Sequence, residues 1–201
     1  MITWILIRHG QTMANEQGVL AGFVETPLSK VGEQQAIALR EYLKETAIHY
    51  FYASSSKRAY ETLQPLAELK QANIEVVGAL KEIHFGDFEG KNFSWIQKHY
   101  PDEVTKMLKE KDHYCYPGGE SLVMAHTRMA KWLQEVSISH ENSVVVVCAH
   151  AGTIRSMLSE FIAGNESLHW HFKIDNASIS TVSVTDGFAV IESLNDTTYL
   201  K

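Results

Sequence analysis

Residues 3–15, TWILIRHGQTMAN, decide the fold that we predict for this chain. Residues 4–7 are apolar and strand-forming, which is typical of a short strand buried on both faces of a sheet. Arg8, His9 and Gly10 follow at once, at the carboxyl end of that strand, where open α/β sheets bind ligands. An imidazole beside a guanidinium indicates an anion site, and the glycine lets the backbone approach a ligand closely. The simplest anion that fits is a phosphoryl group.

Neutral hydrogen-bonding side chains follow the charged pair. Gln11, Thr12 and Asn15 can hold further oxygens, and we predict that they contact substrate. Gly22, in the turn-rich segment 18–28 (GVLAGFVETPL), is a fourth predicted substrate contact. The alternative is that the Arg-His pair is only a solvated turn or an ion-paired rim. If only this motif is considered, the alternative is favoured. The prediction of a phosphoryl site therefore depends on further catalytic residues elsewhere in the chain.

Length and composition narrow the class of protein. The chain has 201 residues, of which 45% are hydrophobic and 21% charged, so it can bury the core of one α/β domain. We predict a single domain over 1–201, with a helical, aromatic-rich insertion at about 87–119. The net charge of −6 argues against nonspecific binding to nucleic acid or anionic membranes. Cys115 and Cys148 form no disulfide framework, and no long apolar segment occurs, so we expect a cytoplasmic protein without a membrane partner.

Predicted strands and helices alternate along most of the chain. Apolar residues at i, i+3 and i+7 predict a helix over 30–44 that Ser29 caps. SVVVVC at 143–148 predicts a fully buried parallel strand, and Asp186-Gly187 predicts a hairpin. The other predicted strands are at about 49–53, 74–77, 179–185 and 188–194. The other predicted helices are at about 54–70, 93–99, 103–111, 122–136 and 153–162, with Asn92 and Asp102 as caps of the two insertion helices. This order predicts a three-layer α/β/α sandwich with a mostly parallel central sheet.

Five candidate catalytic residues fall on the same side of the predicted sheet. Arg8 and His9 follow the first strand, and His150 follows the strand at 143–148. Arg58 lies at the start of a helix, and Glu82 lies in a polar loop. Phosphoryl transfer needs cations around the oxygens, an in-line nucleophile and an acid for the leaving oxygen. This set offers a candidate for each of these roles.

The sequence resembles the histidine phosphatase superfamily, also called phosphoglycerate mutase-like proteins, over nearly its whole length. The matching motifs, in the family's order, are RHGQTMAN (8–15), TPLSKVGEQQA (26–36), SSSKRAYETL (54–63), the Glu82 loop with FGDFEG (85–90), PGGES (117–121) and HAGTIR (150–155). Three letters alone would be weak evidence, but six motifs in order are not expected by chance. The resemblance implies a phosphoglycerate mutase-like fold.

The resemblance also implies an activity, that of a metal-independent phosphomonoesterase without a cofactor. His9 would attack phosphorus and become a phosphohistidine, while Arg8, Arg58 and His150 hold the phosphoryl oxygens. Glu82 would protonate the leaving alkoxide and then activate the water that hydrolyses the phosphohistidine. These roles are expectations that come from the family.

Three positions depart from the commonest family pattern. Ala149 stands where Ser or Thr is frequent, Ala151 where Gly is frequent, and Ser56 where an apolar residue is usual. The differences affect atoms that support and orient His150, and they leave the charged set intact. The resemblance assigns Asn15 a neutral contact with the phosphoryl group.

Among subfamilies, the chain most resembles the α-ribazole 5′-phosphate phosphatases of cobalamin nucleotide-loop assembly. The features that it shares with them are the short length, the FGDFEG loop, the PGGES segment and SLHWHFKIDNASIS at 167–180. The expected partner is therefore a small-molecule phosphate ester, and a homodimer is left open. His169-Trp-His171 lacks the further ligands of a tetrahedral set, so we expect no metal there.

Three alternatives to this function are kept. One is a broad-specificity small-molecule phosphatase, and another is a phosphoglycerate mutase, for which the middle insertion looks too short. The third is a noncatalytic scaffold that binds a phospholigand. A pure binder would not need a nucleophile together with its acid, which argues against the scaffold.

Overall fold

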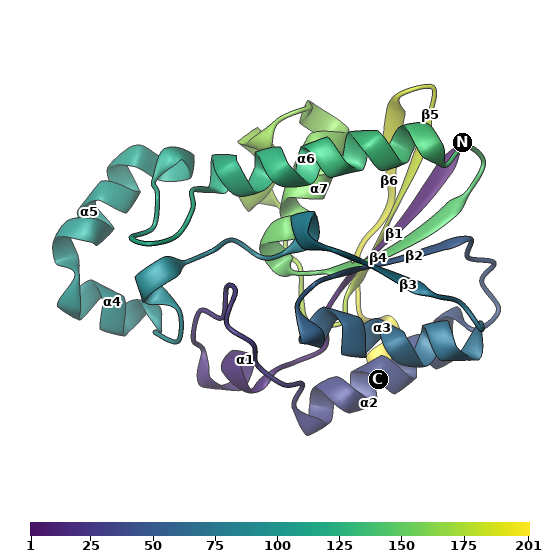
Figure 1. Ribbon diagram of the computed structural model, residues 1–201, viewed down its shortest axis with the longest axis horizontal. Helices are drawn as coiled ribbons and strands as arrows, with labels where there is room; N and C mark the ends of the chain where they lie inside the picture. The colour runs from purple at the N-terminus through teal and green to yellow at the C-terminus, as the bar shows by residue number, and fades with distance from the viewer.

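Six strands form one mixed sheet in the computed structural model, which describes residues 1–201 (Figure 1). The strands are β1 (Ile2–Arg8), β2 (Tyr50–Ser54), β3 (Ile74–Val77), β4 (Val144–Ala149), β5 (Ile179–Thr185) and β6 (Phe188–Asp196). Their order across the sheet is β3-β2-β4-β1-β5-β6. β3, β2, β4 and β1 pair in parallel, and β5 and β6 add antiparallel pairs. The predicted mostly parallel sheet is confirmed.

Helices cover both faces of this sheet. The helices are α1 (Met13–Gln17), α2 (Lys30–Leu43), α3 (Lys57–Leu69), α4 (Phe93–His99), α5 (Pro101–Glu110), α6 (Leu122–Ser139) and α7 (Ala151–Ala163). α2 and α3 pack on one face, and α6 and α7 pack on the other (Figure 1). The α/β/α sandwich predicted from the sequence is therefore confirmed.

β1 lies in the middle of both hydrophobic cores. Trp4 and Leu6 face the core under α6 and α7, whereas Ile5 and Ile7 face the core under α2 and α3. All four side chains are buried, as the apolar run predicted. Burying a large apolar side chain contributes roughly 1.5–3 kcal/mol, so β1 is firmly held on both sides. Its last residue, Arg8, therefore leaves the sheet at a well-defined place.

The segment between β3 and α6 forms an appendage to the left of the sheet in Figure 1. Phe88, Ile96 and Val104 form a small core of its own. Asn92 caps α4 as predicted, since its side chain accepts from the N–H of Trp95. The predicted start of α5 is wrong: the helix begins two residues earlier, at Pro101, and Asp102 lies in its first turn rather than at the cap. A proline suits the first helical position because the N–H that it lacks would have no partner there.

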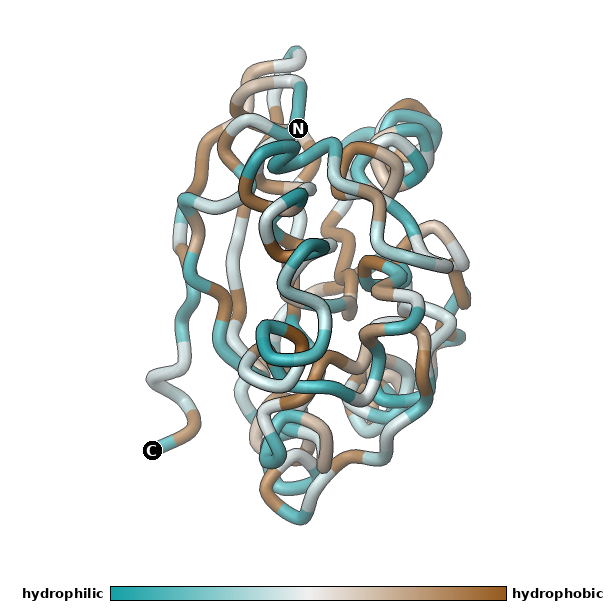
Figure 2. Tube along the Cα trace, turned by 90° about the vertical axis from the view of Figure 1, so that its left-hand side faces the viewer, coloured by the Kyte–Doolittle hydropathy of each residue, from teal (hydrophilic) through white to brown (hydrophobic).

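Two further features agree with the sequence. The β5–β6 hairpin turns at Asp186 and Gly187, whose φ angles of 52° and 78° are both left-handed, as this kind of turn requires. Hydrophilic and hydrophobic residues alternate along the helices (Figure 2), as expected where one helix face is buried and the other exposed. None of the helices combines the length and apolar character needed to cross a membrane.

Candidate active site

The strand register brings two histidines together. β1 and β4 are parallel neighbours, and Arg8 lies opposite Ala149, the last residue of β4. His9 and His150 each come one residue later, so their rings meet beyond the end of the sheet, with centroids 5.1 Å apart. Arg58 reaches the same place from the first turn of α3, which follows β2. These residues line a pocket of about 160 Å³.

His9 is held in one tautomer. Its ring is buried, and Nδ1 lies 2.8 Å from the carbonyl oxygen of Gly10. Because a carbonyl can only accept, Nδ1 carries the proton and Nε2 keeps its lone pair. Gly10 is fixed in turn, since its N–H donates to Thr62 Oγ1 at 2.9 Å, and a Cβ there would come within 2.8 Å of the Gly32 carbonyl oxygen. The result is an oriented imidazole with a free nitrogen.

Arg8 and Asn15 offer hydrogen-bond donors next to His9. Arg8 donates from Nη1 to the carbonyl of Ile174 at 2.7 Å, while its buried Nε has no partner within the protein. The side-chain oxygen of Asn15 accepts from the N–H of Thr12 and from Nδ2 of Asn176. The amide nitrogen of Asn15 is thus left to donate to a ligand. Unpaired donors around a buried pocket suit an anion.

Asn176 is a supporting residue that the sequence analysis missed. Besides Asn15, its Nδ2 contacts the carbonyl of His9 at 3.2 Å. Asn176 lies before β5, within the segment quoted for its family resemblance, but no spacing rule connects it to residues so far away in the chain. The contact forms because β5 pairs with β1, which brings the residues before β5 next to those that follow β1.

Arg58 is almost fully buried and holds three partners. Nη2 donates to the carbonyl of Gly22 at 2.7 Å, Nη1 to that of Val24 at 3.0 Å, and Nε to Nδ1 of His150 at 3.3 Å. Gly22 has a φ of 53°, and a Cβ there would meet the Glu89 carboxylate. The glycine therefore lets this segment close on Arg58, and it also lines the pocket, as predicted for a substrate contact.

His150 obtains its support from the neighbouring strand. Since its Nδ1 accepts from Arg58, Nε2 carries the proton and donates to Ser54 Oγ at 2.8 Å. Ser54 is the last residue of β2. Ala149 is fully buried in the core and adds no polar atom that would need a partner. The departure at position 149 thus leaves His150 oriented through Ser54, which the sequence analysis assigned only to a helix start.

The two histidines are neutral in the free protein at neutral pH. Burial lowers the pKa of His9 well below its usual value, and the charges of Arg58 and Arg8 lower it further. The pKa of His150 is lowered in the same way, first by burial and then by Arg58. Burial also lowers the pKa of Arg8 and of Arg58, but an arginine stays charged. The pocket therefore joins two fixed positive charges to a neutral, nucleophilic imidazole.

Buried neutral histidines make the free energy of unfolding depend on pH. Burial lowers the pKa of His169 to about 3, so with His9 and His150 three histidines resist protonation in the native state. In the unfolded chain they bind protons near pH 6.5, so stability is fully present above that pH and falls as the pH drops below it. We expect a loss of up to about 1.4 kcal/mol per pH unit for each histidine.

Urea unfolding at pH 7.5, 6.5 and 5.5, followed by circular dichroism, measures this loss. In the variant His169→Asn one of the three proton sites is gone, so the midpoint should fall less steeply with pH. A midpoint that does not change between pH 6.5 and 5.5 would contradict the prediction.

Glu82 reaches the pocket from the loop between β3 and α4. Its carboxylate accepts from the N–H of Ile83 at 3.0 Å and from the N–H of Gly152 at 3.1 Å. A Cβ at Gly152 would lie 2.2 Å from Glu82 Oε1, so only glycine allows this approach to the start of α7. The carboxylate is close enough to Arg8 and Arg58 that its charge opposes the lowering of their pKa by burial. A carboxyl group thus lines the anion pocket.

Two of the predicted substrate contacts have other partners. Gln11 lies outside the pocket lining, because its Oε1 accepts from Ser29 Oγ and its N–H donates to Gln35. A contact between Gln11 and substrate stays a prediction. Thr12 does line the pocket, but its hydroxyl accepts from the N–H of Asn15 and donates to the Asn15 side chain, so it caps α1.

Comparisons with known proteins agree with this geometry. The sequence matches the family model of the histidine phosphatase superfamily (branch 1) over residues 4–197. It is 31% identical over 200 residues to phosphoserine phosphatase 1 of Hydrogenobacter thermophilus, covering 100% of this chain and 95% of the relative. It is 25% identical over 190 residues to the adenosylcobalamin/alpha-ribazole phosphatase of Escherichia coli, covering 94% of each.

Two solved structures are similar over the whole fold. The alpha-ribazole phosphatase from Shigella flexneri superposes with a TM-score of 0.91 at 24% identity, covering 96% of each chain. The phosphoserine phosphatase from Entamoeba histolytica in complex with 3-phosphoglyceric acid has a TM-score of 0.87 at 26% identity, covering 100% of each chain.

Proposed function

This chain belongs to the histidine phosphatase superfamily, and from that premise we propose that it hydrolyses phosphate monoesters of small alcohols through a phosphohistidine at His9. The observation that carries the proposal is the state of His9. A neutral imidazole with a free Nε2 lies beside the buried Arg58 and the partly buried Arg8, in a pocket that also contains a carboxyl group. The same charges and donors would stabilise the phosphoryl group while it is transferred from the ester oxygen to His9.

The proposed reaction has two steps. In the first, His9 Nε2 attacks phosphorus, the bond from phosphorus to the ester oxygen breaks, and Glu82 gives its proton to that oxygen. In the second, Glu82 takes a proton from water, the water oxygen attacks phosphorus, and the bond from nitrogen to phosphorus breaks. Phosphate leaves, and His9 and Glu82 return to their starting states. Arg8 and Arg58 hold the phosphoryl oxygens in both steps, and His150 positions Arg58 by accepting a hydrogen bond from its Nε.

For the alcohol, we propose α-ribazole, as the 5′-phosphate. A hollow of about 410 Å³ lies beside the Glu82 loop, lined by Ile83, Tyr116 and Trp170 among others. Ile83 follows Glu82 directly, and Tyr116 packs edge-on against Phe85, which lines the phosphoryl pocket. An apolar, partly aromatic hollow near the acid suits an alcohol that carries an aromatic base. Phosphoserine is the second candidate, because a phosphoserine phosphatase has the higher sequence identity, 31%.

A steady-state screen tests the substrate. It compares α-ribazole 5′-phosphate, phosphoserine, 3-phosphoglycerate and a sugar phosphate, with release of phosphate and formation of isomerised product both measured. We expect kcat/KM to be highest for α-ribazole 5′-phosphate, and Trp170→Ala to lower it for that substrate but not for phosphoserine. A higher value for phosphoserine would transfer the proposal to that substrate. Isomerisation without phosphate release would mean a mutase, and binding without turnover would mean a scaffold.

Activity should survive exhaustive treatment with EDTA. Arg8 and Arg58 can neutralise the phosphoryl charge that a metal ion would otherwise balance. The structure contains no group of three or more histidine, cysteine, aspartate or glutamate side chains arranged to hold a metal ion. The rate is measured before and after chelation on the same preparation. Loss of activity that returns only when zinc or magnesium is added would contradict metal independence.

A further inference from the structure

We infer that Arg128, which lies outside the lining of the phosphoryl pocket, is a positioning residue that holds the main chain of Glu82 where its carboxyl group can protonate the leaving oxygen. The inference rests on the phosphatase mechanism proposed above. It assigns to α6 a part in the chemistry, although that helix supplies no residue to the pocket itself.

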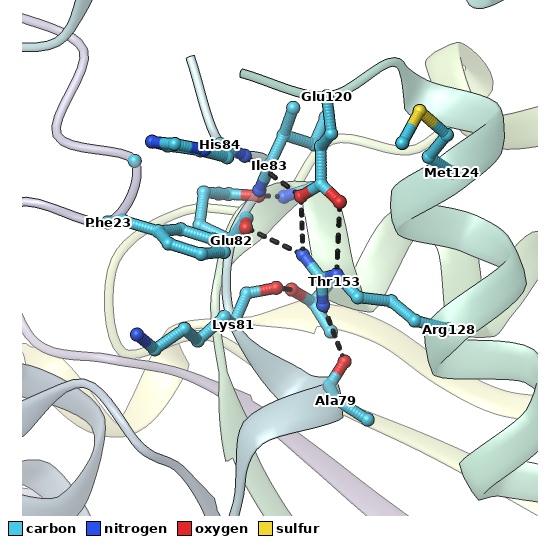
Figure 3. Close-up of polar contacts among 12 residues, drawn as sticks. Phe23, Ala79, Lys81, Glu82, Ile83, His84, Glu120, Met124, Arg128 and Thr153 are labelled. Atoms are coloured by element: carbon cyan, nitrogen blue, oxygen red, sulfur yellow. Dashed lines mark hydrogen bonds and ion pairs between the residues drawn. The ribbon is translucent and has the colours of Figure 1, made fainter. Parts of the chain in front are cut away.

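Arg128 joins both ends of the short segment that leads to Glu82. Nη1 donates to the carbonyl of Ala79 at 2.6 Å, and Nη2 donates to the carbonyl of Glu82 itself at 2.7 Å (Figure 3). Ala79 lies in the 3-10 helix Gly78–Leu80 that follows β3. The planar guanidinium has its donors in fixed directions, so two bonds from one group set the distance and the orientation between these carbonyls.

Glu120 completes the arrangement from the other side of Glu82. Its Oε1 accepts from Arg128 Nη2 at 2.8 Å, and its Oε2 lies 3.3 Å from Arg128 Nε. The same Oε1 accepts from the N–H of His84 at 2.9 Å, and the N–H of Glu120 donates to the His84 carbonyl at 3.0 Å. The Arg128–Glu120 pair thus fixes the chain both at Glu82 and two residues beyond it (Figure 3).

The side chain of Glu82 has little other support. Its carboxylate contacts only main-chain N–H groups, those of Ile83 and Gly152. If the main chain at Glu82 turned or shifted, the carboxylate would move away from Gly152 and from the leaving oxygen. A misplacement of about 1 Å can cost on the order of 10²-fold in rate. The two carbonyl contacts of Arg128 are therefore suited to control the acid.

The same cluster connects the acid to the phosphoryl-binding arginine. Phe23 stacks on His84 with ring centroids 4.5 Å apart, and Arg128 Cζ lies 5.9 Å from the Phe23 ring centre. Phe23 stands between Gly22 and Val24, whose carbonyls accept from Arg58. Holding the Glu82 loop thus also steadies the segment against which Arg58 is bonded.

The test compares leaving groups in a single turnover. Formation of the phosphoenzyme is followed with an alkyl phosphate, which needs the proton, and with p-nitrophenyl phosphate, which hardly does. For Arg128→Met we expect a loss of about 10- to 100-fold on the alkyl phosphate and of less than about threefold on p-nitrophenyl phosphate. Arg128→Lys retains a donor for the carbonyls and should fall between the wild type and Arg128→Met.

A double-variant experiment separates positioning from general destabilisation. In a Glu82→Gln background the acid is already absent, so adding Arg128→Met should cause little further loss on the alkyl phosphate. The matched control is Lys131→Met on the same helix, which removes the same charge from an exposed side chain. Its rates should equal those of the wild type on both substrates.

The outcomes are distinguishable. Equal losses on the two leaving groups, or losses that multiply with those of Glu82→Gln, would overturn the positioning role and leave the proposed phosphatase function standing. If wild-type protein formed no phosphoenzyme, both proposals would fall. If circular dichroism shows that Arg128→Met is unfolded, Glu120→Gln loosens the same arrangement from the other side. The absence of leaving-group dependence in that variant would also overturn the inference.

Discussion

His9→Ala should reduce turnover by about 10⁴-fold or more, because it removes the proposed nucleophile. No other imidazole in the pocket can replace it, since both ring nitrogens of His150 are engaged, by Arg58 and by Ser54. The fold should survive. His9 lies beyond the end of β1, and the only hydrogen bond of its ring is to the neighbouring Gly10. The measurements are phosphate release and the circular dichroism spectrum.

A labelled substrate provides the companion measurement. With a ³²P-labelled phosphate ester, acid-labile label should appear on the wild-type protein and be absent from His9→Ala. Inorganic phosphate should still bind to the variant, because Arg8 and Arg58 remain. Wild-type turnover in His9→Ala would exclude the phosphohistidine mechanism.

Glu82→Gln should slow formation of the phosphoenzyme by about 10²- to 10⁴-fold on an alkyl phosphate, and clearly less on p-nitrophenyl phosphate. An alkoxide that leaves at high pKa needs a proton, whereas nitrophenolate does not. A glutamine at this position keeps nearly the same shape and an acceptor oxygen for the N–H of Gly152. The loss should therefore reflect the missing proton rather than a displaced loop. Single-turnover kinetics are required, because Glu82 also acts in the proposed hydrolysis of the phosphohistidine.

Asp87→Asn is the matched control for this experiment. Asp87 is an exposed carboxylate five residues later in the same loop, so the substitution makes the same change of charge nearby. Both rates should stay at the wild-type level. If Glu82→Gln lowered the rate of phosphoenzyme formation equally on both substrates, Glu82 would not be the leaving-group acid. Asp87 and His84 would then be tested for that role.

Much of the fold was predictable because it depends on local patterns. The apolar run at residues 4–7 indicates a strand buried on both faces, and β1 divides these side chains between two cores. Ser29 and Asn92 cap helices as predicted, since such caps are made within one turn. The start of α5 was mispredicted because the sequence offers two starts close together, Pro101 and Asp102, and the proline is the one used.

The charged part of the site was also accessible from sequence, because each of its residues follows a strand or begins a helix. The residues that hold these charged side chains in place were not accessible from the sequence. Ser54, Asn176 and Arg128 contact partners more than 40 residues away in the chain, and no periodicity marks them. The side chain of Gln11 bonds to Ser29, the residue that caps α2, and no local pattern indicates this contact. Which way a loop side chain turns depends on neighbours that only the folded chain supplies.

The contacts between His84 and Glu120 also bear on how such an enzyme can change over evolutionary time. Two hydrogen bonds join these residues, and the aromatic appendage leaves and rejoins the sandwich at this neck. The two chain segments of the neck also approach each other closely at Gly86, where an added Cβ would lie 2.0 Å from the Pro117 carbonyl oxygen. Since the neck is fastened to α6, residues 92–116 can be lengthened, shortened or replaced without moving Glu82. Substrate range can then diverge among descendants while the reaction itself is inherited unchanged.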